Sequence, residues 1–378
     1  MRLVDFLDQS SALSSPESSN AQFFDLDNNL SFSYLEMVNS SIHLAHFLAK
    51  RGVKPQDVVA TYAPNSIAAF CCIFAISRIG AIWLPLNTKN TVNANTKLIS
   101  ISDAKFLFVE EEIYIQNPEL LDSFNIDKIG CLSKNKIADF NLSVLKTSAQ
   151  DIPLPKTNIF KKDPNKNEYV SSYEEEIISL FPTGGTTGDP KLARWGISSW
   201  NAIVEIQSKQ MQTTDISPCY LVAASMTHAA GIGSFATILQ GGSIVVMDGF
   251  SPEKILNAIQ KYKVTSLFLP PTAIYMLLSF DNIKFYDFSS LRHFWYAAAP
   301  MSVDKLKEAI SIFGPVMVQT YGQAEAPMIC TFFSAQDHIK ALNAGNNSIL
   351  GSCGKASPGI EIAILDEHGD SVPEGSKG

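Results

Sequence analysis

The stretch VVATYAPNSIAAFCCIFAISRIGAIWLPL, residues 58–86, determines the fold class. Residues 58–62 and the short apolar run 81–84 have the composition of strands, and the segment that starts at Ser66 has the length of a helix. Because strands joined by a crossover helix run parallel, this alternation predicts a parallel sheet. We therefore expect an α/β fold.

A membrane-spanning helix is the alternative interpretation of residues 68–86, which are largely apolar and nearly long enough to cross a bilayer. Asn65, however, is a good N-cap, and Arg78 with Gly80 is typical of a helix end. Pro85 then follows a short strand-like run. We expect helix, turn and strand here, and no membrane span.

Further elements flank this unit. Ser33 and Glu36 form a capping box that begins an amphipathic helix, and Gly52 ends it. The apolar side chains at helical spacing are Leu35, Val38, Ile42, Ala45 and Leu48. Residues 105–109 are typical of another strand, and the polar stretch 132–176 predicts a surface connection between subdomains.

The alternation resumes after Ile177. Strands are expected at 242–247, 265–269 and 316–319, and helices at 251–262 and 302–313. After Gly351 the chain is rich in glycine and proline, and the alternating run 360–365 favours a small β subdomain. We expect two stacked α/β subdomains with mainly parallel sheets, residues 1–175 and 176–340, followed by the start of a small β-barrel subdomain, 341–378.

The composition argues against several classes of function. A formal net charge of −8 disfavours a nucleic-acid or anionic-membrane surface, since phosphates need clustered positive charge. The six cysteines contain no CxxC pair and no histidine spacing that would complete a tetrahedral metal site. Residues 1–5 lack the apolar region of a secretory signal. We expect a cytoplasmic protein with reduced thiols.

The strongest local signal is the apolar run 177–181 followed by PTGGTTGDPK, residues 182–191. Bare backbone N–H groups, rotatable hydroxyls and one ammonium suit a polyphosphate. They come from Thr183, Gly184, Gly185, Thr186, Thr187, Gly188 and Lys191. The spacing is not that of a Walker A loop, because Asp189-Pro190 stands where its lysine is required. The alternative is a flexible Gly/Thr turn.

The second signal is QTYGQAE, residues 319–325, directly after an expected strand. Ligands of open parallel sheets gather beyond the carboxyl ends of the strands. An aromatic face and a carboxylate at that place suit a base and a metal ion. The alternative is an ordinary polar loop with a buried tyrosine.

These two segments resemble the Thr-Ser-Gly-Thr-Thr-Gly-x-Pro-Lys and Tyr-Gly-x-Thr-Glu motifs of the adenylate-forming superfamily, which includes acyl- and aryl-CoA synthetases, amino-acid adenylation domains and luciferases. The resemblance extends through residues 63–66, 84–87, 296–300 and 351–355. It implies the large N-terminal domain of that superfamily. The small mobile domain, with the lysine used in adenylation, follows the equivalent of Gly378 in the family, so this chain alone is expected to bind ATP or acyl-AMP but to adenylate poorly.

The resemblance implies a role for each matching residue. ATP would be bound by Thr183, Gly184, Gly185, Thr186, Thr187, Gly188, Lys191, Ala298, Ala299, Pro300, Thr320, Tyr321, Gly322, Gln323 and Ala324. Catalytic roles would belong to Thr183, Thr186, Lys191 and Glu325. Tyr321 would stack on adenine, and Glu325 would bind Mg²⁺.

The acid substrate would lie near His228, Gly231 and Ala297, with His228 at the border of an acyl tunnel. A structural histidine is the alternative for His228. Several positions depart from the family pattern: Gly184 replaces a serine, Ala324 a threonine, Gly196-Ile197 a Thr-His pair and Ala297-Ala298 a Gly-Gly pair.

The implied reaction joins a small carboxylic acid to ATP, giving acyl-AMP, and then transfers the acyl group to coenzyme A. Amino-acid-activating relatives usually carry an aspartate where this chain has Met226-Thr227-His228, which favours an acyl- or aryl-CoA synthetase. Loading of a carrier-protein pantetheine and a nucleotide-binding pseudoenzyme are the alternatives. The particular acid and the oligomeric state are left open.

Overall fold

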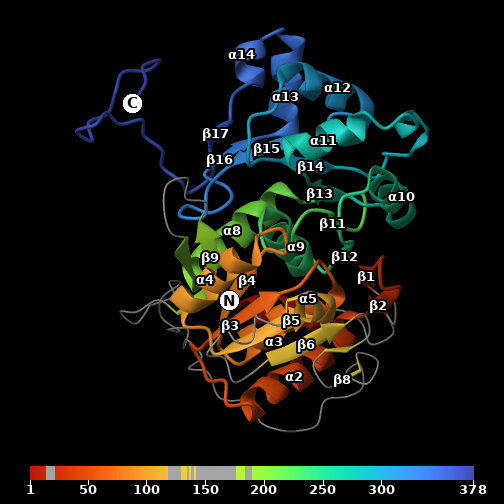
Figure 1. Ribbon diagram of the computed structural model, residues 1–378. Coiled ribbons are helices and arrows are strands. Elements are labelled where there is room, and N and C mark those ends of the chain that lie inside the picture. Colours follow the sequence, from red (N-terminus) through yellow and green to blue (C-terminus); the bar gives the residue numbers. More distant parts are fainter. Residues whose placement is uncertain (14–21, 118–128, 134–135, 138–139, 142–175, 184–189) are drawn as a thin grey trace.

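The computed structural model describes residues 1–13, 22–117, 129–133, 136–137, 140–141, 176–183 and 190–378. Two mixed, mainly parallel sheets organise this part of the chain (Figure 1). The larger sheet has the order β17 (Lys355–Ala356), β16 (Thr331–Phe333), β15 (Met317–Tyr321), β14 (His293–Tyr296), β13 (Ser266–Phe268), β11 (Cys219–Val222), β12 (Ser243–Val246), β1 (Phe23–Asp25) and β2 (Leu30–Phe32). Its strands from β15 to β1 are parallel, and β2, β16 and β17 are antiparallel at its two ends.

The smaller sheet has the order β10 (Lys191–Gly196), β9 (Ile177–Thr183), β4 (Ile82–Leu86), β3 (Val58–Tyr62), β5 (Phe106–Glu110), β6 (Ile129–Ser133), β7 (Lys136–Ile137) and β8 (Phe140–Asn141). Strands β9, β4, β3, β5 and β6 are parallel, and β10 returns antiparallel beside β9. The expected α/β class with mainly parallel sheets is confirmed.

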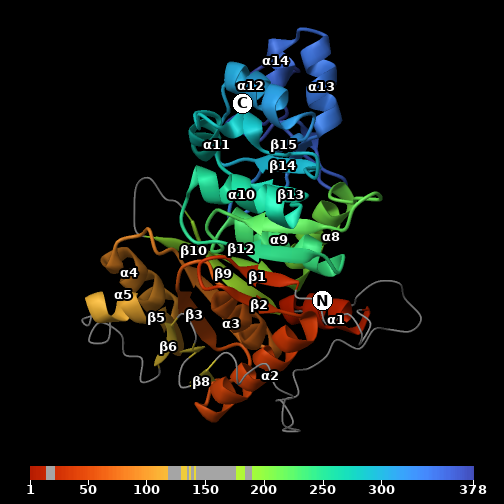
Figure 2. The ribbon, with the colours of Figure 1, turned by 90° about the vertical axis from the view of Figure 1, so that its right-hand side faces the viewer.

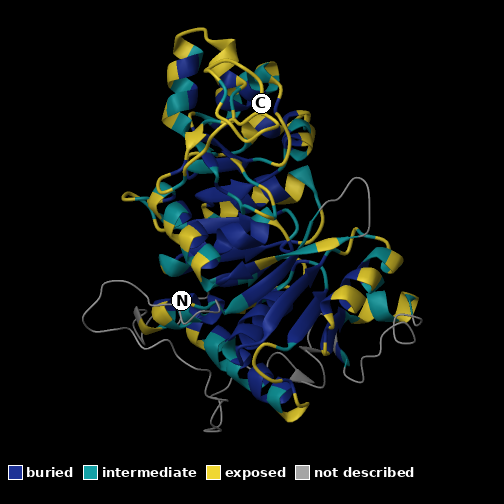
Figure 3. Cartoon of the chain, turned by 90° about the vertical axis from the view of Figure 1, so that its left-hand side faces the viewer, coloured by how far each residue is buried: buried dark blue, intermediate teal, exposed yellow. Residues whose placement is uncertain are grey.

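Helices form layers around the two sheets (Figure 2). The described helices are α1 (Leu3–Leu13), α2 (Tyr34–Lys50), α3 (Ile67–Arg78), α4 (Val92–Ser102), α5 (Glu111–Gln116), α8 (Ile197–Gln210), α9 (Ala229–Leu239), α10 (Pro252–Tyr262), α11 (Pro271–Leu278), η1 (Ile283–Phe285), α12 (Val303–Phe313), α13 (Ala335–Asn343) and α14 (Asn347–Leu350). Helices α1, α2, α3, α8 and α9 share one core with the facing sides of both sheets, whereas α10 to α13 cover the far side of the larger sheet. Figure 3 shows the buried residues concentrated in the sheets and the layer between them.

The apolar segment 68–86 forms most of α3 and then β4, as helix, turn and strand. Helix α3 is buried along almost its whole length in this middle layer. Burial raises the pKa of its Cys71 thiol to about 12. None of the helices in the described part of the chain combines the length and hydrophobicity needed to cross a membrane. The apolar composition of α3 therefore reflects its central position between protein surfaces.

Two details of the helices differ from expectation. The N-cap of α3 is Ser66, whose hydroxyl accepts a hydrogen bond from Ala69 N at 3.1 Å, whereas Asn65 was expected to cap it. In α2 the capping box of Ser33 and Glu36 is present, but Leu35 is 62% exposed. The buried side of α2 includes the expected Ala45 and Leu48, together with Tyr34, Met37, Leu44 and Phe47.

Residues before and after position 175 contribute strands to both sheets. The expected domain limits themselves stay a prediction. The amino-terminal strand β1 pairs with β12, so residues 23–25 lie in the larger sheet. Strands β9 and β10 lie in the smaller one. The chain thus crosses between the sheets more often than the sequence pattern indicates.

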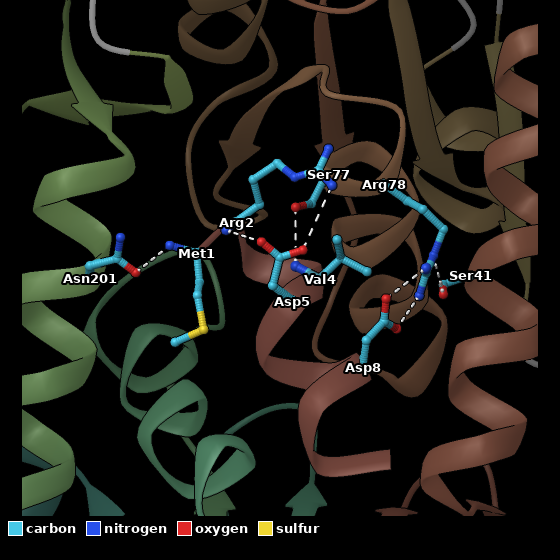
Figure 4. Close-up of polar contacts among 9 residues, drawn as sticks. All are labelled: Met1, Arg2, Val4, Asp5, Asp8, Ser41, Ser77, Arg78 and Asn201. Atoms are coloured by element: carbon cyan, nitrogen blue, oxygen red, sulfur yellow. Dashed lines mark hydrogen bonds and ion pairs between the residues drawn. The ribbon is translucent and has the colours of Figure 1, made fainter. Parts of the chain in front are cut away.

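The amino-terminal helix α1, for which no element was predicted, lies against α2, α3 and α9. Figure 4 shows the polar contacts around it. The Met1 ammonium donates to Asn201 Oδ1 of α8 at 2.8 Å. Arg78 of α3 donates two hydrogen bonds to the Asp8 carboxylate, at 2.6 and 2.9 Å, and a third to Ser41 Oγ of α2 at 3.1 Å. These contacts join α1, α2 and α3 to one another, and the amino terminus to α8.

Residues 351–378 contain β17 and one isolated bridge between Leu365 and Ser371. The expected strand at 360–365 is not formed, since nothing in the described residues pairs with its backbone beyond that bridge, and a lone strand leaves its N–H and C=O groups unpaired. The described residues form no closed barrel.

Candidate functional site

The hairpin of β9 and β10 carries both ends of the expected phosphate loop. Thr183 at the end of β9 pairs in register with Lys191 at the start of β10. Thr183 is half-buried and Lys191 is exposed. Gly184, Gly185, Thr186, Thr187 and Gly188 lie outside the described residues. The described residues that flank the loop therefore lie on two paired strands.

An aromatic cluster lies against the hairpin. Phe181 of β9 stacks on Trp195 of β10, with ring centroids 4.0 Å apart and planes at 27°. Trp200 of α8 meets Trp195 edge-on at 5.5 Å, and its indole N–H donates to Ser179 Oγ at 2.9 Å. Such packing of large rings fixes the hairpin against α8.

The motif 319–325 is attached to this hairpin. Trp195 Nε1 donates to the carbonyl oxygen of Ala324 at 2.7 Å. Within the motif, Thr320 is buried, whereas Tyr321 is 49% exposed and presents its ring at the end of β15. Gln323 and Glu325 are exposed. The two strongest sequence signals are thus brought together by a side chain that neither pattern contains.

Gly322 is required by a close approach of the backbone. A Cβ at this position would lie 2.6 Å from the amide nitrogen of Met328, which belongs to the returning chain. That segment is held by the amide of Cys330, which donates to the carbonyl oxygen of Tyr321 at 2.8 Å. The glycine therefore permits the tight loop between β15 and β16.

Residues 297–300 follow β14, the strand next to β15 in the sheet. Parallel pairing of β14 with β15 places these residues beside the motif 319–325 at the carboxyl ends of the strands. Ala298, Ala299 and Pro300 are exposed, and Ala297 is half-buried. Ala298 has a φ of 72°, in the left-handed region that favours glycine.

His228 is the N-cap residue of α9, beyond the carboxyl end of β11. Its Nε2 accepts a hydrogen bond of 3.1 Å from the Nδ2 of Asn87, which follows β4 of the other sheet. The imidazole is open to solvent on one side, but desolvation by the surrounding protein lowers its pKa. A neutral ring matches its role as an acceptor.

Asn65 holds the segment that leads to His228. Its amide nitrogen donates to the carbonyl oxygens of Ala224 at 2.8 Å and Met247 at 3.0 Å, and its Oδ1 accepts from Met226 N at 2.8 Å. Gly231 closes the same turn, because a Cβ there would lie 2.0 Å from the Met226 carbonyl oxygen. Asn65 follows β3 of the smaller sheet. Its hydrogen bonds therefore fix this turn across the junction of the two sheets.

A small cavity with room for roughly one water molecule lies behind the motif 319–325. Its lining residues come from α8, α9, four strands of the larger sheet and the segment after the motif: Gln207, Tyr220, Ala229, Phe268, Trp295, Thr320, Met328 and Ile329. Thr320 belongs to the expected nucleotide site, and Ala229 follows His228. The other lining residues were not predicted, and closeness to the motif is a sequence signal only for Met328 and Ile329.

Glu325 is the residue expected to bind Mg²⁺. Magnesium in nucleotide sites is commonly held by one or two carboxylates together with substrate phosphates. The exposed carboxylate of Glu325, next to Ala324 and its link to the phosphate-loop hairpin, fits that donor set. Among the described residues, no group of three or more His, Cys, Asp or Glu side chains is placed to hold a metal by itself.

Comparison with known proteins agrees with this architecture. The family model described as AMP-binding enzyme matches residues 11–378. A medium/long-chain-fatty-acid–CoA ligase of Mycobacterium tuberculosis is 33% identical over 204 residues, 54% of this chain and 34% of that protein. A feruloyl-CoA synthase of Amycolatopsis sp. is 26% identical over 351 residues, 92% of this chain and 63% of that protein. The chain therefore spans less than two thirds of the length of these relatives.

The fold is also that of solved structures. The luciferase-like enzyme of the nonluminescent Zophobas morio mealworm superposes with a TM-score of 0.81 at 24% identity, covering 100% of this chain and 84% of that one. At this level of identity the likeness establishes the arrangement of the elements.

Proposed function

Because the chain belongs to the AMP-binding enzyme family, we propose that it forms the nucleotide-binding part of an enzyme that activates a carboxylic acid with ATP and transfers the acyl group to coenzyme A. The observation that carries the proposal is the hydrogen bond from Trp195 to Ala324, which joins the phosphate-loop hairpin to the motif 319–325. The hairpin that carries the expected polyphosphate loop and the motif that carries the proposed platform for a base are thus directly linked.

In the proposed reaction a carboxylate oxygen attacks the α-phosphorus of ATP, and pyrophosphate leaves. The thiol sulfur of coenzyme A then attacks the acyl carbon, and AMP leaves. The loop hydroxyls of Thr183 and Thr186 and the Lys191 ammonium would bind the phosphates, and the exposed ring of Tyr321 would stack on adenine. Glu325 would hold Mg²⁺, which neutralises phosphate charge. Positioning and charge neutralisation would supply most of the acceleration.

The departures from the family pattern are compatible with this proposal. Ala324 contributes its backbone carbonyl to the link with Trp195, so the absent threonine hydroxyl leaves that link in place. His228 and the turn before it carry no carboxylate to pair with a substrate ammonium, which supports an acid without an amino group. A coenzyme A ligase is therefore favoured over an adenylation domain that loads an amino acid.

Nucleotide titration tests the proposal. We expect Mg-ATP, AMP and non-hydrolysable acyl-adenylate analogues to raise the melting temperature, because ligands of the native state stabilise it. Tyr321→Ala should weaken AMP binding by about tenfold through lost stacking. Phe285→Ala removes a ring on η1 that is more exposed, 85% against 49% for Tyr321, and serves as the control. Absence of any nucleotide binding by the wild-type chain would contradict the proposal.

A second assay separates an enzyme from a nucleotide-binding pseudoenzyme. The chain, joined to the segment that follows the equivalent region in its relatives, is incubated with ATP and a panel of carboxylic acids. Release of pyrophosphate that depends on the acid is the expected result. Binding of ATP without any such release would favour the pseudoenzyme.

A further inference from the structure

The cavity behind the motif 319–325 contains buried polar groups that the proposed reaction does not use. They are the Tyr220 hydroxyl, the Trp295 indole N–H and the Gln207 carbonyl oxygen Oε1, on side chains that are 0%, 3% and 3% exposed. None of these atoms has a hydrogen-bond partner among the described residues. A polar group that is buried without a partner destabilises the native state, so three of them in one cavity indicate a missing partner.

The clustering of these groups is specific to the cavity. In the described part of the chain, five buried side-chain atoms lack a partner, and the other two belong to His46 and Ser357, which do not line it. Gly233 of α9 also faces this place, since a Cβ there would lie 2.5 Å from the Tyr220 hydroxyl and 3.1 Å from Gln207 Nε2. The glycine leaves room for the phenol and the amide to lie side by side.

The donors and acceptors define what the partner must offer. An indole N–H only donates, an amide oxygen only accepts, and a phenol does both. Burial raises the pKa of Tyr220, so its hydroxyl keeps its proton. A ligand group that satisfies Trp295 and Gln207 together must accept one hydrogen bond and donate another, as a hydroxyl does. A carboxylate only accepts, an ammonium only donates, and a plain alkyl or aryl end leaves all three groups unpaired.

We propose that the acid accepted by this site carries a hydroxyl group, alcoholic or phenolic, which enters the cavity and is bound by Trp295, Tyr220 and Gln207. The inference rests on the proposed function, because the cavity adjoins Thr320 of the nucleotide motif and Ala229 next to His228. An acyl group attached to AMP at that motif would therefore point its far end toward the three polar groups. The cavity as a whole has room for roughly one water molecule, about the size of a hydroxyl.

Matched acyl-adenylate analogues test the inference. Acylsulfamoyl adenosines are prepared with cinnamoyl and its ortho-, meta- and para-hydroxy derivatives, and with octanoyl and ω-hydroxyoctanoyl. Binding to the chain is measured by calorimetry. At least one hydroxylated analogue should bind at least about tenfold more tightly than its unsubstituted parent. This is the gain in affinity expected from one or two buried hydrogen bonds.

Variants assign the preference to the named residues. Trp295→Phe and Tyr220→Phe each remove a hydrogen-bonding group while keeping a ring, so both should reduce the hydroxyl preference and leave the affinity for the parent analogue within about threefold. Tyr34→Phe is the control, because the buried Tyr34 hydroxyl donates to the Gly242 carbonyl oxygen at 2.8 Å, away from the cavity. That variant should keep the full preference.

The outcomes separate the two proposals. If the parent analogues bind as tightly as every hydroxylated one, as they would if a fixed water always filled the cavity, the hydroxyl inference is wrong and the nucleotide site stands. If a preference exists but survives in Trp295→Phe and Tyr220→Phe, its assignment to this cavity is wrong. If neither Mg-ATP nor any analogue binds, the proposed function fails first.

Discussion

Trp195 in β10 and Ala324 in the motif 319–325 are 129 residues apart in the sequence, yet the indole nitrogen of the first donates a 2.7 Å hydrogen bond to the carbonyl oxygen of the second. Trp195 also stacks on Phe181, so the same ring orients the phosphate-loop hairpin and the motif. Because a hydrogen bond to a backbone carbonyl fixes the position of the chain, we infer that this contact sets the geometry of the nucleotide site.

Trp195→Phe should keep the stacked ring and lose the hydrogen bond. We expect a loss of about 1 kcal/mol in the free energy of unfolding and a reduction of about tenfold in AMP affinity, since the motif loses its anchor. Trp200→Phe is the matched control, because it removes the indole hydrogen bond to Ser179 from the same aromatic cluster. It should lower stability similarly in urea unfolding while leaving AMP affinity near wild type; equal affinity losses in both variants would contradict the role of Trp195.

Local signals account for what the sequence predicts well. The capping box of Ser33 and Glu36, the left-handed Gly52 after α2 and the N-cap Ser251 of α10 act within a few residues, and each is present in the structure. Strand β3 is similarly recognisable, because a strand in the middle of a parallel sheet is continuously apolar.

Contacts between distant segments account for what the sequence does not reveal. The pairing of β1 with β12 joins residues more than two hundred positions apart, and no local pattern encodes it. Asn65 was assigned to a helix cap because that is its common local role, whereas its three hydrogen bonds go to the other sheet. The candidate site was predicted from its two motifs, but Trp195, which positions it, belongs to no motif. Asn87 lies in the matched segment 84–87, but no local pattern indicates its contact with His228.

Ala298→Gly should stabilise the protein. Alanine at a φ of 72° costs about 1 kcal/mol relative to glycine, which adopts left-handed backbone freely. The expected gain, up to about 1 kcal/mol, is measured by urea unfolding. Ala299→Gly is the control, because this exposed neighbour has no positive φ. The added backbone freedom of the unfolded chain should lower the free energy of unfolding of this variant by a few tenths to about 1 kcal/mol. Equal effects of the two variants would show that strain at Ala298 is negligible.

Asn65→Ala should destabilise the fold strongly, because it leaves two carbonyl oxygens and one amide of the His228 turn without their partner. We expect a loss of about 3 kcal/mol or more in the free energy of unfolding. Asn346→Ala offers the comparison, since this exposed side chain accepts one capping bond, from Ile349 N at 3.1 Å, and should cost about 1 kcal/mol. A small effect of Asn65→Ala would mean that water replaces the amide.

Tyr34→Phe and Tyr220→Phe remove the same atom from two fully buried tyrosines. The Tyr34 hydroxyl is hydrogen-bonded, so its loss should cost about 1 kcal/mol or more. The Tyr220 hydroxyl has no partner in the described residues, so its removal should be neutral or stabilising. Thermal unfolding without ligand gives both values; similar losses would indicate that a buried water already pairs with Tyr220.

His338 should make the protein sensitive to mild acid. Its Nε2 lies 2.8 Å from the Tyr296 hydroxyl, which also lies 3.1 Å from Gln319 Oε1, and its Nδ1 lies 2.8 Å from the Ser334 carbonyl oxygen. In the neutral ring with its proton on Nδ1, the Nε2 accepts a hydrogen bond from the phenol. Burial lowers its pKa from 6.5 to about 4, against the opposing effects of the bond to Ser334 and the nearby Asp337 carboxylate. The unfolded chain therefore binds a proton between these pH values that the native chain does not, so stability falls as the pH drops from 6.5 toward 4.

The contribution of His338 can be isolated with His338→Gln, whose amide can both donate to Ser334 and accept from Tyr296 without titrating. Between about pH 7 and about pH 4.5, the wild type should lose about 2 kcal/mol more free energy of unfolding than the variant. The measurement is urea unfolding at each pH. His293, whose pKa burial also lowers to about 4, keeps the same acid sensitivity in both proteins and cancels from the comparison. Parallel pH profiles for the two proteins would show that the His338 ring is protonated in the native state without cost, and that its bond to Tyr296 does not depend on a neutral imidazole.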